Sequence, residues 1–331
     1  ERRGWTAAEL ADRTAPTAGF EVVDGRPTLA LDLGPRVLQA RLDERLAVVI
    51  ESADGATSKS FPKPRKDDDP TRHAAAKKAF GAAKKLVKQT VRAQSARFYD
   101  AMCAGQRWDA DTWTTSLSGH PVVGRLVERL VWVALRDGER VGAFRPLPDG
   151  TLTDVEDEPY VLDASSEVAL AHRALLGGAQ AERWRAHLVD YEVPSLFPQL
   201  ETEPLELSPA QRDATAYRAL EGHLLPAFTL RNELTGRGYE RGAAGDGGIF
   251  AEYVRPFASL GLIASVEFSG SPLPEVNETV ALTRIVFSSR EETLALGEVP
   301  PILLAEVVGH AGRAAAQGSG HDPDWEAKVL W

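Results

Sequence analysis

The sequence predicts an α+β protein with antiparallel sheets, flanking helices and two or three subdomains. Three observations predict this class. Short β-prone runs separated by turn-forming residues fill positions 1–60, a Lys- and Ala-rich helical pattern covers about 70 to 103, and three alternating runs lie between 249 and 289. The 331 residues are also enough for two or three domains of about 100–200 residues each.

We divide the chain into four segments by composition and pattern. They are a β-rich N-terminal subdomain (1–60), a Pro-rich connector with a long basic helix (61–108), an α/β core (109–200), and a segment with two helices, a glycine-rich connection, strands and a C-terminal helix (201–331).

The long helix of the second segment is predicted to have two different faces. At about 100° per residue, its apolar side chains form one narrow stripe. These are Phe80, Val87, Val91, Phe98 and Met102. Basic side chains follow one another along a flank of the same helix. These are Lys77, Lys78, Lys84, Lys85, Lys88 and Arg92.

The charge of the chain is unevenly distributed. From Ser60 to Tyr99 there are 11 Lys or Arg and 3 Asp, a net charge of +8, so a total of −10 leaves −18 elsewhere. The acidic total argues against a protein that coats nucleic acid with its whole surface. A local contact with nucleic acid through the basic flank remains open, and so does a solvated face or one that binds an acidic protein surface.

The third segment is predicted to alternate helices and strands. HPVVGRLVERL has a helical pattern, and VWVALRDGERVGAF is a hairpin that turns at Asp137-Gly138. ASSEVALAHRALL and AQAERWRAHLVDY are predicted as two further helices.

The fourth segment begins with a helix signal. In SPAQRDATAYRALEGHL, Ser208 and Gln211 make a capping box, and Pro209 suits the first helical position. A second helix is expected near 226 to 235. IFAEYV, GLIASVEF and TVALTRIVFS are expected to be antiparallel strands, and PPILLAEVVGHAGRAAA a final helix.

Short motifs spread along the chain carry a family resemblance. They include AGFEVVDG, LDLGPR, FPKP with DDD, the His-Pro of HPVVGRL, Trp184, the Asp-Tyr-Glu at 190–192, FPQL, LLAEVV and GHDPDW. With these motifs the chain resembles the bacterial domain of unknown function 4132 family, whose MolR-like members are molybdate metabolism regulator-like proteins. Arg173 stands where the family tends to have Pro, and the family runs on beyond the point that corresponds to Trp331.

This resemblance implies regulation through partners and no particular chemistry. Some relatives carry a nucleic-acid-associated WGR domain, and others belong to systems with MoxR-type ATPases and von Willebrand A proteins. With Glu1 as the first residue, we expect the chain to be a fragment or processed product of a larger protein. The expected partners are other domains of that protein or a separate protein, with nucleic acid as an alternative and no membrane.

No standard catalytic or nucleotide signature occurs. The sequence has no phosphate-loop motif, no HExxH and no GxSxG, and GRGYERG has the wrong spacing for a dinucleotide-binding loop. A single cysteine, Cys103, excludes an internal disulfide and a multi-cysteine zinc site. We therefore predict no cofactor and no metal, and with no export signal recognised we expect a cytoplasmic protein.

A few residues could still form an enzyme site. The candidates are His120, Arg145, His172, Asp190 and Glu192. The structural alternatives are that His120 and His172 cap helices and that the two acids bind backbone donors. Arg145 could bind an anionic ligand, but a structural ion pair with Asp190 or Glu192 is the favoured interpretation. His187 lies close to Asp190 in the sequence, but the resemblance does not include it.

The function that we favour is a non-catalytic regulatory or protein-interaction module of a larger bacterial protein. The first alternative is a nucleic-acid-binding regulator that uses the basic helix at 72–97. The second is an enzyme with its site near Arg145, His172, Asp190 and Glu192.

Overall fold

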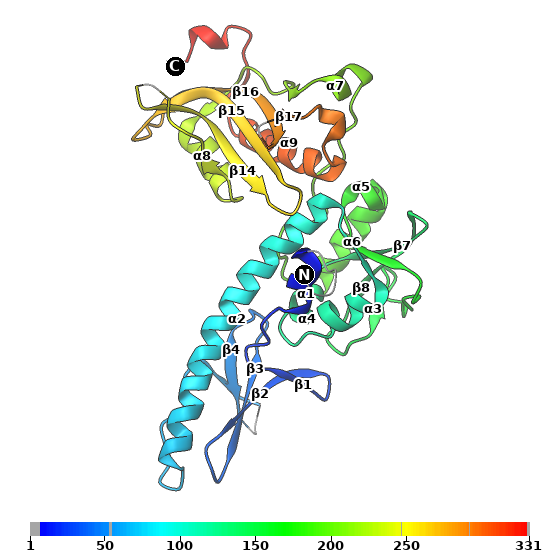
Figure 1. The fold of residues 1–331 in the computed structure, drawn as a ribbon, viewed down its shortest axis with the longest axis vertical. Coiled ribbons are helices and arrows are strands. Elements are labelled where there is room, and N and C mark those ends of the chain that lie inside the picture. Colours follow the sequence, from blue (N-terminus) through cyan, green and yellow to red (C-terminus); the bar gives the residue numbers. More distant parts are fainter. Residues whose placement is uncertain (1–6, 53–54, 246, 291, 330–331) are drawn as a thin grey trace. The chain divides into compact units, whose positions relative to one another are not determined.

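The computed structural model describes residues 7–52, 55–245, 247–290 and 292–329. Within them, helices accompany three antiparallel sheets, which confirms the predicted α+β class. The chain forms two compact units (Figure 1). Unit 1 comprises Glu1–Met102 and Gln106–Leu200, and unit 2 comprises Cys103–Gly105 and Glu201–Trp331.

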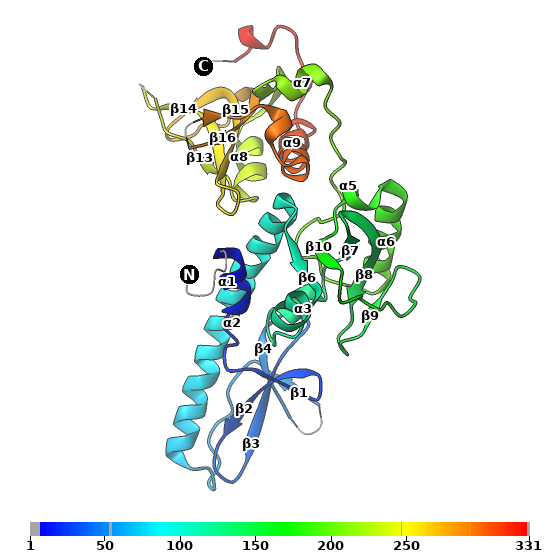
Figure 2. The same cartoon turned by 45° about the vertical axis from the view of Figure 1, so that its right-hand side comes forward.

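The first sheet of unit 1 is an antiparallel meander that packs on a long helix (Figure 2). After helix α1 (Ala7–Arg13), the strands are β1 (Glu21–Val23), β2 (Arg26–Asp32), β3 (Val37–Leu42), β4 (Val48–Glu51) and β5 (Thr57–Ser58), and helix α2 is Pro70–Ala104. Phe80 and Val87 of α2 are buried with Leu31 and Ile50 of the sheet. The sheet therefore covers the apolar face of α2 as far as Val91.

The apolar stripe predicted for α2 is confirmed. Phe80, Val87, Phe98 and Met102 are at most 4% exposed, and Val91 is half-buried against the sheet. The helix extends for 35 residues because its buried positions recur every three or four residues, so that one face stays against the core.

The second sheet of unit 1 has the strand order β6-β10-β7-β8-β9. Its strands are β6 (Arg107–Asp109), β7 (Trp132–Arg136), β8 (Glu139–Pro146), β9 (Leu152–Thr153) and β10 (Glu167–Leu170). Its helices are α3 (Ala110–Thr112), the π-helix η1 (Trp113–Ser118), α4 (Gly124–Val127), α5 (Arg173–Leu176) and α6 (Gly178–Asp190). The predicted hairpin is confirmed, since β7 and β8 pair around Asp137 and Gly138, both at positive φ.

Alternation along β7 gives this sheet two buried faces. Val133 and Leu135 join a cluster that includes Ala181 and Trp184 of α6. Trp132 points to an aromatic group instead, where its ring meets Phe98 of α2 edge-on. Because neighbouring strand residues face opposite sides, one short strand connects both layers.

Unit 2 is built on a third antiparallel sheet with the order β13-β14-β15-β16-β12-β18, and β11 and β17 also pair with β16. Its strands are β11 (Ala216–Tyr217), β12 (His223–Pro226), β13 (Glu240–Arg241), β14 (Ile249–Phe257), β15 (Leu262–Pro272), β16 (Thr279–Ser289), β17 (Glu292–Thr293) and β18 (Gly320–His321). Its helices are α7 (Pro209–Asp213), α8 (Ala227–Thr235), η2 (Leu296–Glu298), α9 (Pro301–Ala315) and η3 (Trp325–Ala327). The predicted strands at 249–289 and the predicted final helix are confirmed.

Two predicted helices are wrong in part. ASSEVALAHRALL contains strand β10 and only a four-residue helix, α5, because Val168 and Ala169 pair with both β6 and β7. Ser208, Pro209 and Gln211 do start a helix with a capping box, but α7 lasts five residues, and the chain then pairs with β16 through β11 and β12. In both places, pairing in a sheet overrides the local helical pattern.

The helical pattern of HPVVGRLVERL is also shorter than predicted. Only Gly124–Val127 is α-helical, and turns lie on both sides of it. No helix in the described ranges has the length and apolarity that a bilayer span requires.

Candidate functional site

A cavity of about 500 Å³ lies in unit 1, where the end of β8 meets α4 and the residues that follow α6. Arg145 is on its wall, at the end of a strand whose backbone is held by pairing with Thr153 of β9. The other lining residues are Glu44, Arg125, Glu128, Arg129, Leu147, Pro148, Asp149, Tyr191, Glu192, Val193 and Pro194.

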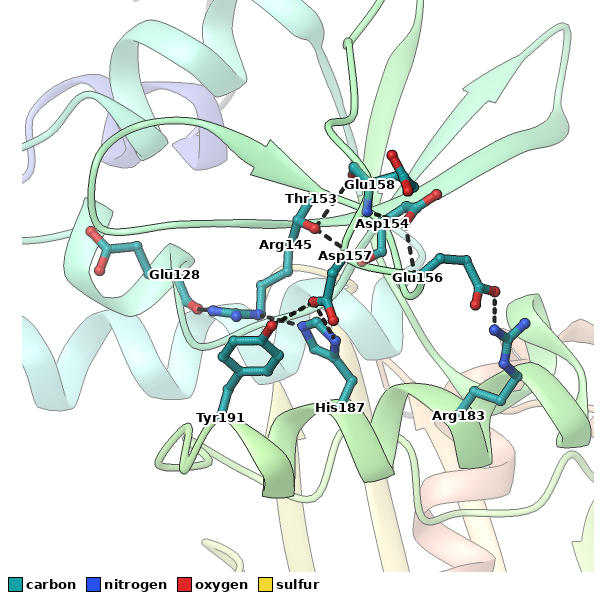
Figure 3. A network of polar contacts seen from close by, with 10 residues as sticks. All are labelled: Glu128, Arg145, Thr153, Asp154, Glu156, Asp157, Glu158, Arg183, His187 and Tyr191. Carbon is teal, nitrogen blue, oxygen red and sulfur yellow. Dashed lines mark hydrogen bonds and ion pairs between the residues drawn. The ribbon is translucent and has the colours of Figure 1, made fainter.

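Arg145 is the least exposed charged group of this cavity, at 4%. Its Nε donates to His187 Nε2 over 3.4 Å, and its Nη1 donates to the backbone oxygen of Glu128 over 3.5 Å (Figure 3). No carboxylate of the described residues lies within 4.0 Å of it, so the expected ion pair with Asp190 or Glu192 is not formed. The guanidinium is thus a buried cation with long contacts to neutral groups.

His187 connects Arg145 to a second pair of side chains. Its Nδ1 lies 3.5 Å from Asp157 Oδ1, and the Tyr191 hydroxyl donates to the same oxygen over 2.8 Å (Figure 3). Because Arg145 donates to Nε2, that nitrogen carries the lone pair, and the Nδ1 proton is left for Asp157. Tyr191 also holds Arg145 from one side, with the guanidinium carbon 5.5 Å from its ring centroid.

Burial and the neighbouring cation determine the protonation of this cluster. The pKa of His187 is lowered, first by burial and then by the positive charge of Arg145. Burial lowers the pKa of Arg145 and raises the pKa of Glu128, while the hydrogen bond to Asp157 raises the pKa of Tyr191. His187 is therefore neutral at neutral pH and acts as an acceptor for Arg145.

This lowered pKa predicts how His187 affects stability in acid. Below a pH of about 6.5, His187 binds a proton more readily in the unfolded chain than in the folded one. The contribution of His187 to the free energy of unfolding is therefore lost as the pH falls. We expect His187→Gln to reduce the pH dependence of the unfolding free energy below that pH, by at most about 1.4 kcal/mol per pH unit, as measured by urea unfolding at several pH values. An unchanged slope in the variant would show that His187 is protonated equally easily in the folded chain.

The other candidate residues have separate places. His120 accepts from the backbone N–H groups of Val122 and Val123 at 3.1 and 3.0 Å, and it lines a neighbouring cavity of about 240 Å³. Buried His172 accepts from Ala174 N at 3.0 Å and so caps α5. Both are helix or turn caps, as the structural alternative predicted.

The two acids after α6 also separate. Asp190 is exposed at the end of the helix, whereas Glu192 lines the Arg145 cavity with a positive φ of 51°. The structure therefore brings together Arg145 and Glu192 from the candidate set. His172 and Asp190 do not line that cavity.

Sequence reasoning missed His187, Asp157 and Tyr191 as neighbours of Arg145. One signal was present, since His187 and Tyr191 are four residues apart and so share a helix face. Nothing in the sequence placed Asp157 there, because it lies in a turn between β9 and β10 that only the folded chain brings to α6.

The second candidate is the basic face of α2, which we define by six side chains. They are Lys77, Lys78, Lys84, Lys85, Lys88 and Arg92. All six are exposed, and none forms an ion pair with a residue that the structure describes. Lys84 Nζ donates to the backbone oxygen of Lys59 over 2.9 Å and lies 5.4 Å from the centroid of the Phe80 ring.

Several residues of the short motifs have structural tasks. Gln199 is 5% exposed, and its amide side chain binds both the N–H and the C=O of Val131 as well as the C=O of Ala171. Its side-chain amide thereby makes the hydrogen bonds that the backbone of a neighbouring strand would otherwise make. Trp184 is fully buried between α6 and the second sheet.

Among the described residues, no group of three or more His, Cys, Asp or Glu could hold a metal ion. The fold and the two sites define an α+β protein with a small cavity around a buried arginine and a cationic helix face that forms no ion pair with the residues described.

The chain belongs to a family of unknown function. Residues 55–239 match the family described as "Domain of unknown function (DUF4132)". The chain is 29% identical over 225 residues to "Uncharacterized protein YehI" of Escherichia coli (strain K12). That alignment covers 67% of this chain and 18% of the relative, so the matched part of the chain spans less than a fifth of that relative's length. No solved structure matches.

Proposed function

We propose that this chain is a non-catalytic interaction module of a larger regulatory protein in the cytoplasm, and that it binds nucleic acid through the basic face of α2. The proposal rests on the six exposed cations of that face, none of which forms an ion pair with a described residue. The resemblance to MolR-like proteins supports the regulatory role. The alignment covers only 18% of the relative, which supports the proposal that the chain belongs to a larger protein.

The contrast with other surface cations strengthens this proposal. Several exposed arginines elsewhere in unit 1 pair with carboxylates, as Arg107 does with Glu167 at 2.9 Å and Arg136 with Asp163 at 2.7 Å. The basic face has no such counterions among the residues that the structure describes. Its charges are therefore available to phosphates, whose neutralisation releases condensed counterions.

The dimensions suit a nucleic-acid backbone. Fifteen residues separate Lys77 from Arg92, which at about 1.5 Å per residue spans about 22 Å of helix. Duplex DNA carries one charge per about 1.7 Å of its axis, so several phosphates lie within that length. Exposed Lys59, Lys63 and Lys66 add positive charge on the segment that precedes α2.

The cavity around Arg145 favours a binding role over a catalytic one. Its lining contains no Ser, Thr, Cys or Lys nucleophile among the residues described. The enzyme alternative required four residues in one cleft, and only Arg145 and Glu192 line this one. The basic face could instead bind an acidic domain of the parent protein. The experiment below distinguishes this partner from nucleic acid.

Charge reversal tests the proposal. The variant K84E/K85E/K88E should bind a fluorescent DNA duplex at least about tenfold more weakly than the wild type at low salt. The slope of log affinity against log salt should fall by about three, because three phosphate contacts are lost. Fluorescence anisotropy at several salt concentrations measures both quantities, with a single-stranded RNA as a second probe.

A matched control carries the same charge change elsewhere in unit 1. R140E/R183E/R185E alters three exposed arginines of β8 and α6 and should leave binding within about threefold of the wild type. Equal losses in both variants would mean that net charge alone governs binding. If the wild type bound neither probe at low salt, the proposal would be wrong, and binding of an acidic domain of the parent protein would take its place.

A further inference from the structure

We propose that the cavity around Arg145 binds a small oxyanion, a carboxylate or a phosphate, through the guanidinium of Arg145. The inference is independent of nucleic-acid binding, because it rests on other residues of unit 1. Its basis is a cation that is 4% exposed, faces a cavity of about 500 Å³ and has no carboxylate partner in the described chain.

An unpaired buried cation is unfavourable unless something compensates it. Arg36, in contrast, forms a bidentate pair with buried Asp68 at 2.8 and 2.9 Å. Among the described residues, Arg145 makes only the two hydrogen bonds of 3.4 and 3.5 Å, both longer than the usual range for N–H donors. The folded chain thus keeps this guanidinium in place with little of its hydrogen-bonding capacity used.

Donors for a ligand remain on Arg145. A guanidinium has five N–H groups in a planar fork, and the two contacts occupy one on Nε and one on Nη1. The three remaining N–H groups have no acceptor among the residues described. A planar fork with adjacent free donors matches two oxygens of one carboxylate or phosphate.

The surroundings fix the orientation of Arg145. His187 accepts from Nε, Asp157 lies beside His187, and the Tyr191 ring supports the guanidinium from one side. Together with the hydrogen bond from Nη1 to the Glu128 backbone oxygen, these contacts leave Nη2 and the second N–H of Nη1 to meet a ligand. Such a held arginine loses less rotamer freedom on binding than an exposed one would.

The lining of the cavity restricts the ligand to a small molecule. Its volume lies within the range of about 300–1,000 Å³ that small-molecule sites occupy. The other two arginines are already engaged, Arg125 with Glu128 and Arg129 with the backbone oxygen of Glu44. Acidic Glu44, Asp149 and Glu192 also line the cavity, so they disfavour a polyanion such as nucleic acid.

Titration calorimetry on the whole chain tests the proposal, with inorganic phosphate, acetate and succinate as separate probes. We expect at least one of them to bind. Stronger binding of phosphate would identify a phosphate-bearing ligand, and stronger binding of acetate or succinate a carboxylate. Failure of the wild type to bind any of the three at millimolar concentrations would overturn the proposal.

Variants locate the binding. R145K keeps the charge but loses the fork, and it should weaken binding more than about tenfold. V193W fills the cavity from half-buried Val193 without altering Arg145, and it should weaken binding equally. The control R136Q removes an exposed arginine that pairs with Asp163, and it should bind as the wild type does. Undiminished binding in folded R145K and V193W would place the anion elsewhere and reject the site.

A second readout distinguishes a ligand site from a structural role. Because the charge of Arg145 helps to lower the pKa of His187, an anion on Arg145 should raise that pKa. The imidazole signals of His187, followed by NMR across pH with and without the probe, report this shift. A bound probe that leaves the His187 titration unchanged would show that it does not meet Arg145.

Discussion

Replacing Asp12 with alanine is expected to destabilise unit 1 by about 3–5 kcal/mol, the usual result of removing one partner from a buried ion pair. Asp12 of α1 is 1% exposed and accepts from the guanidinium of Arg97 in α2. Its second oxygen accepts from Trp108 Nε1 over 2.9 Å. One buried carboxylate thus joins α1, α2 and β6, and its loss leaves buried donors without this acceptor.

Urea unfolding followed by tryptophan fluorescence measures this loss, since Trp108, Trp113, Trp132 and Trp184 are all buried in unit 1. The double variant D12L/R97M should be less destabilised than D12A, because it removes both charges together. As a control, Glu156→Ala breaks the exposed pair with Arg183 and should cost no more than about 1 kcal/mol. Equal costs for D12A and E156A would contradict the importance of the buried pair.

Replacing Trp132 with alanine should cost about 3–5 kcal/mol of unfolding free energy, the usual range for a buried aromatic residue. Its side chain is fully buried in β7. Its ring lies edge-on to Phe98, Trp108 and Trp113, with centroids 5.9, 5.7 and 5.5 Å away. Its Nε1 also donates to the backbone oxygen of Val127 over 3.0 Å, so the substitution opens a cavity and loses a hydrogen bond.

The same urea titration tests this prediction against two reference variants. Trp132→Phe retains most of the ring contacts and should be clearly less destabilising than the alanine variant. Val161→Ala lies at a position that is 86% exposed and should change stability by no more than about 0.5 kcal/mol. A W132A chain as stable as V161A would show that the aromatic group contributes little to folding.

Regular patterns in the sequence were enough for the long elements. The buried face of α2 recurs every three or four residues, and buried residues alternate with less buried ones along most of the eleven-residue β15. Such periods are repeated often enough to separate a helix from a strand.

Short elements could not be assigned in this way. Val168 and Ala169 sit in a four-residue strand next to His172, which caps a four-residue helix. A run this short fits either period, and only the simultaneous pairing with β6 and β7 makes it a strand. The capping box at Ser208 likewise predicted where a helix begins but not that it ends at Asp213.

The candidate site was predicted in part. Arg145 was selected because it ends a strand at a turn, and the structure places it on a cavity wall. The favoured ion pair with Asp190 or Glu192 was wrong, since no carboxylate reaches it in the described residues. Its real neighbours, His187 and Tyr191, follow from how α6 packs on the second sheet, and that packing depends on Trp184 and on residues far away in the chain.

The sequence by itself determined α2 and its two faces. In a helix, residues three or four positions apart share a face, so one continuous segment shows both the apolar and the basic face. The sequence also determined that this basic segment stands apart from an acidic remainder. Only the tertiary structure decided that the six cations of the basic face lack counterions and that Arg145 is buried without a carboxylate partner among the described residues. Whether a cation has a counterion, or lines a cavity, depends on segments that are far apart in the sequence. These segments come together only when the chain packs.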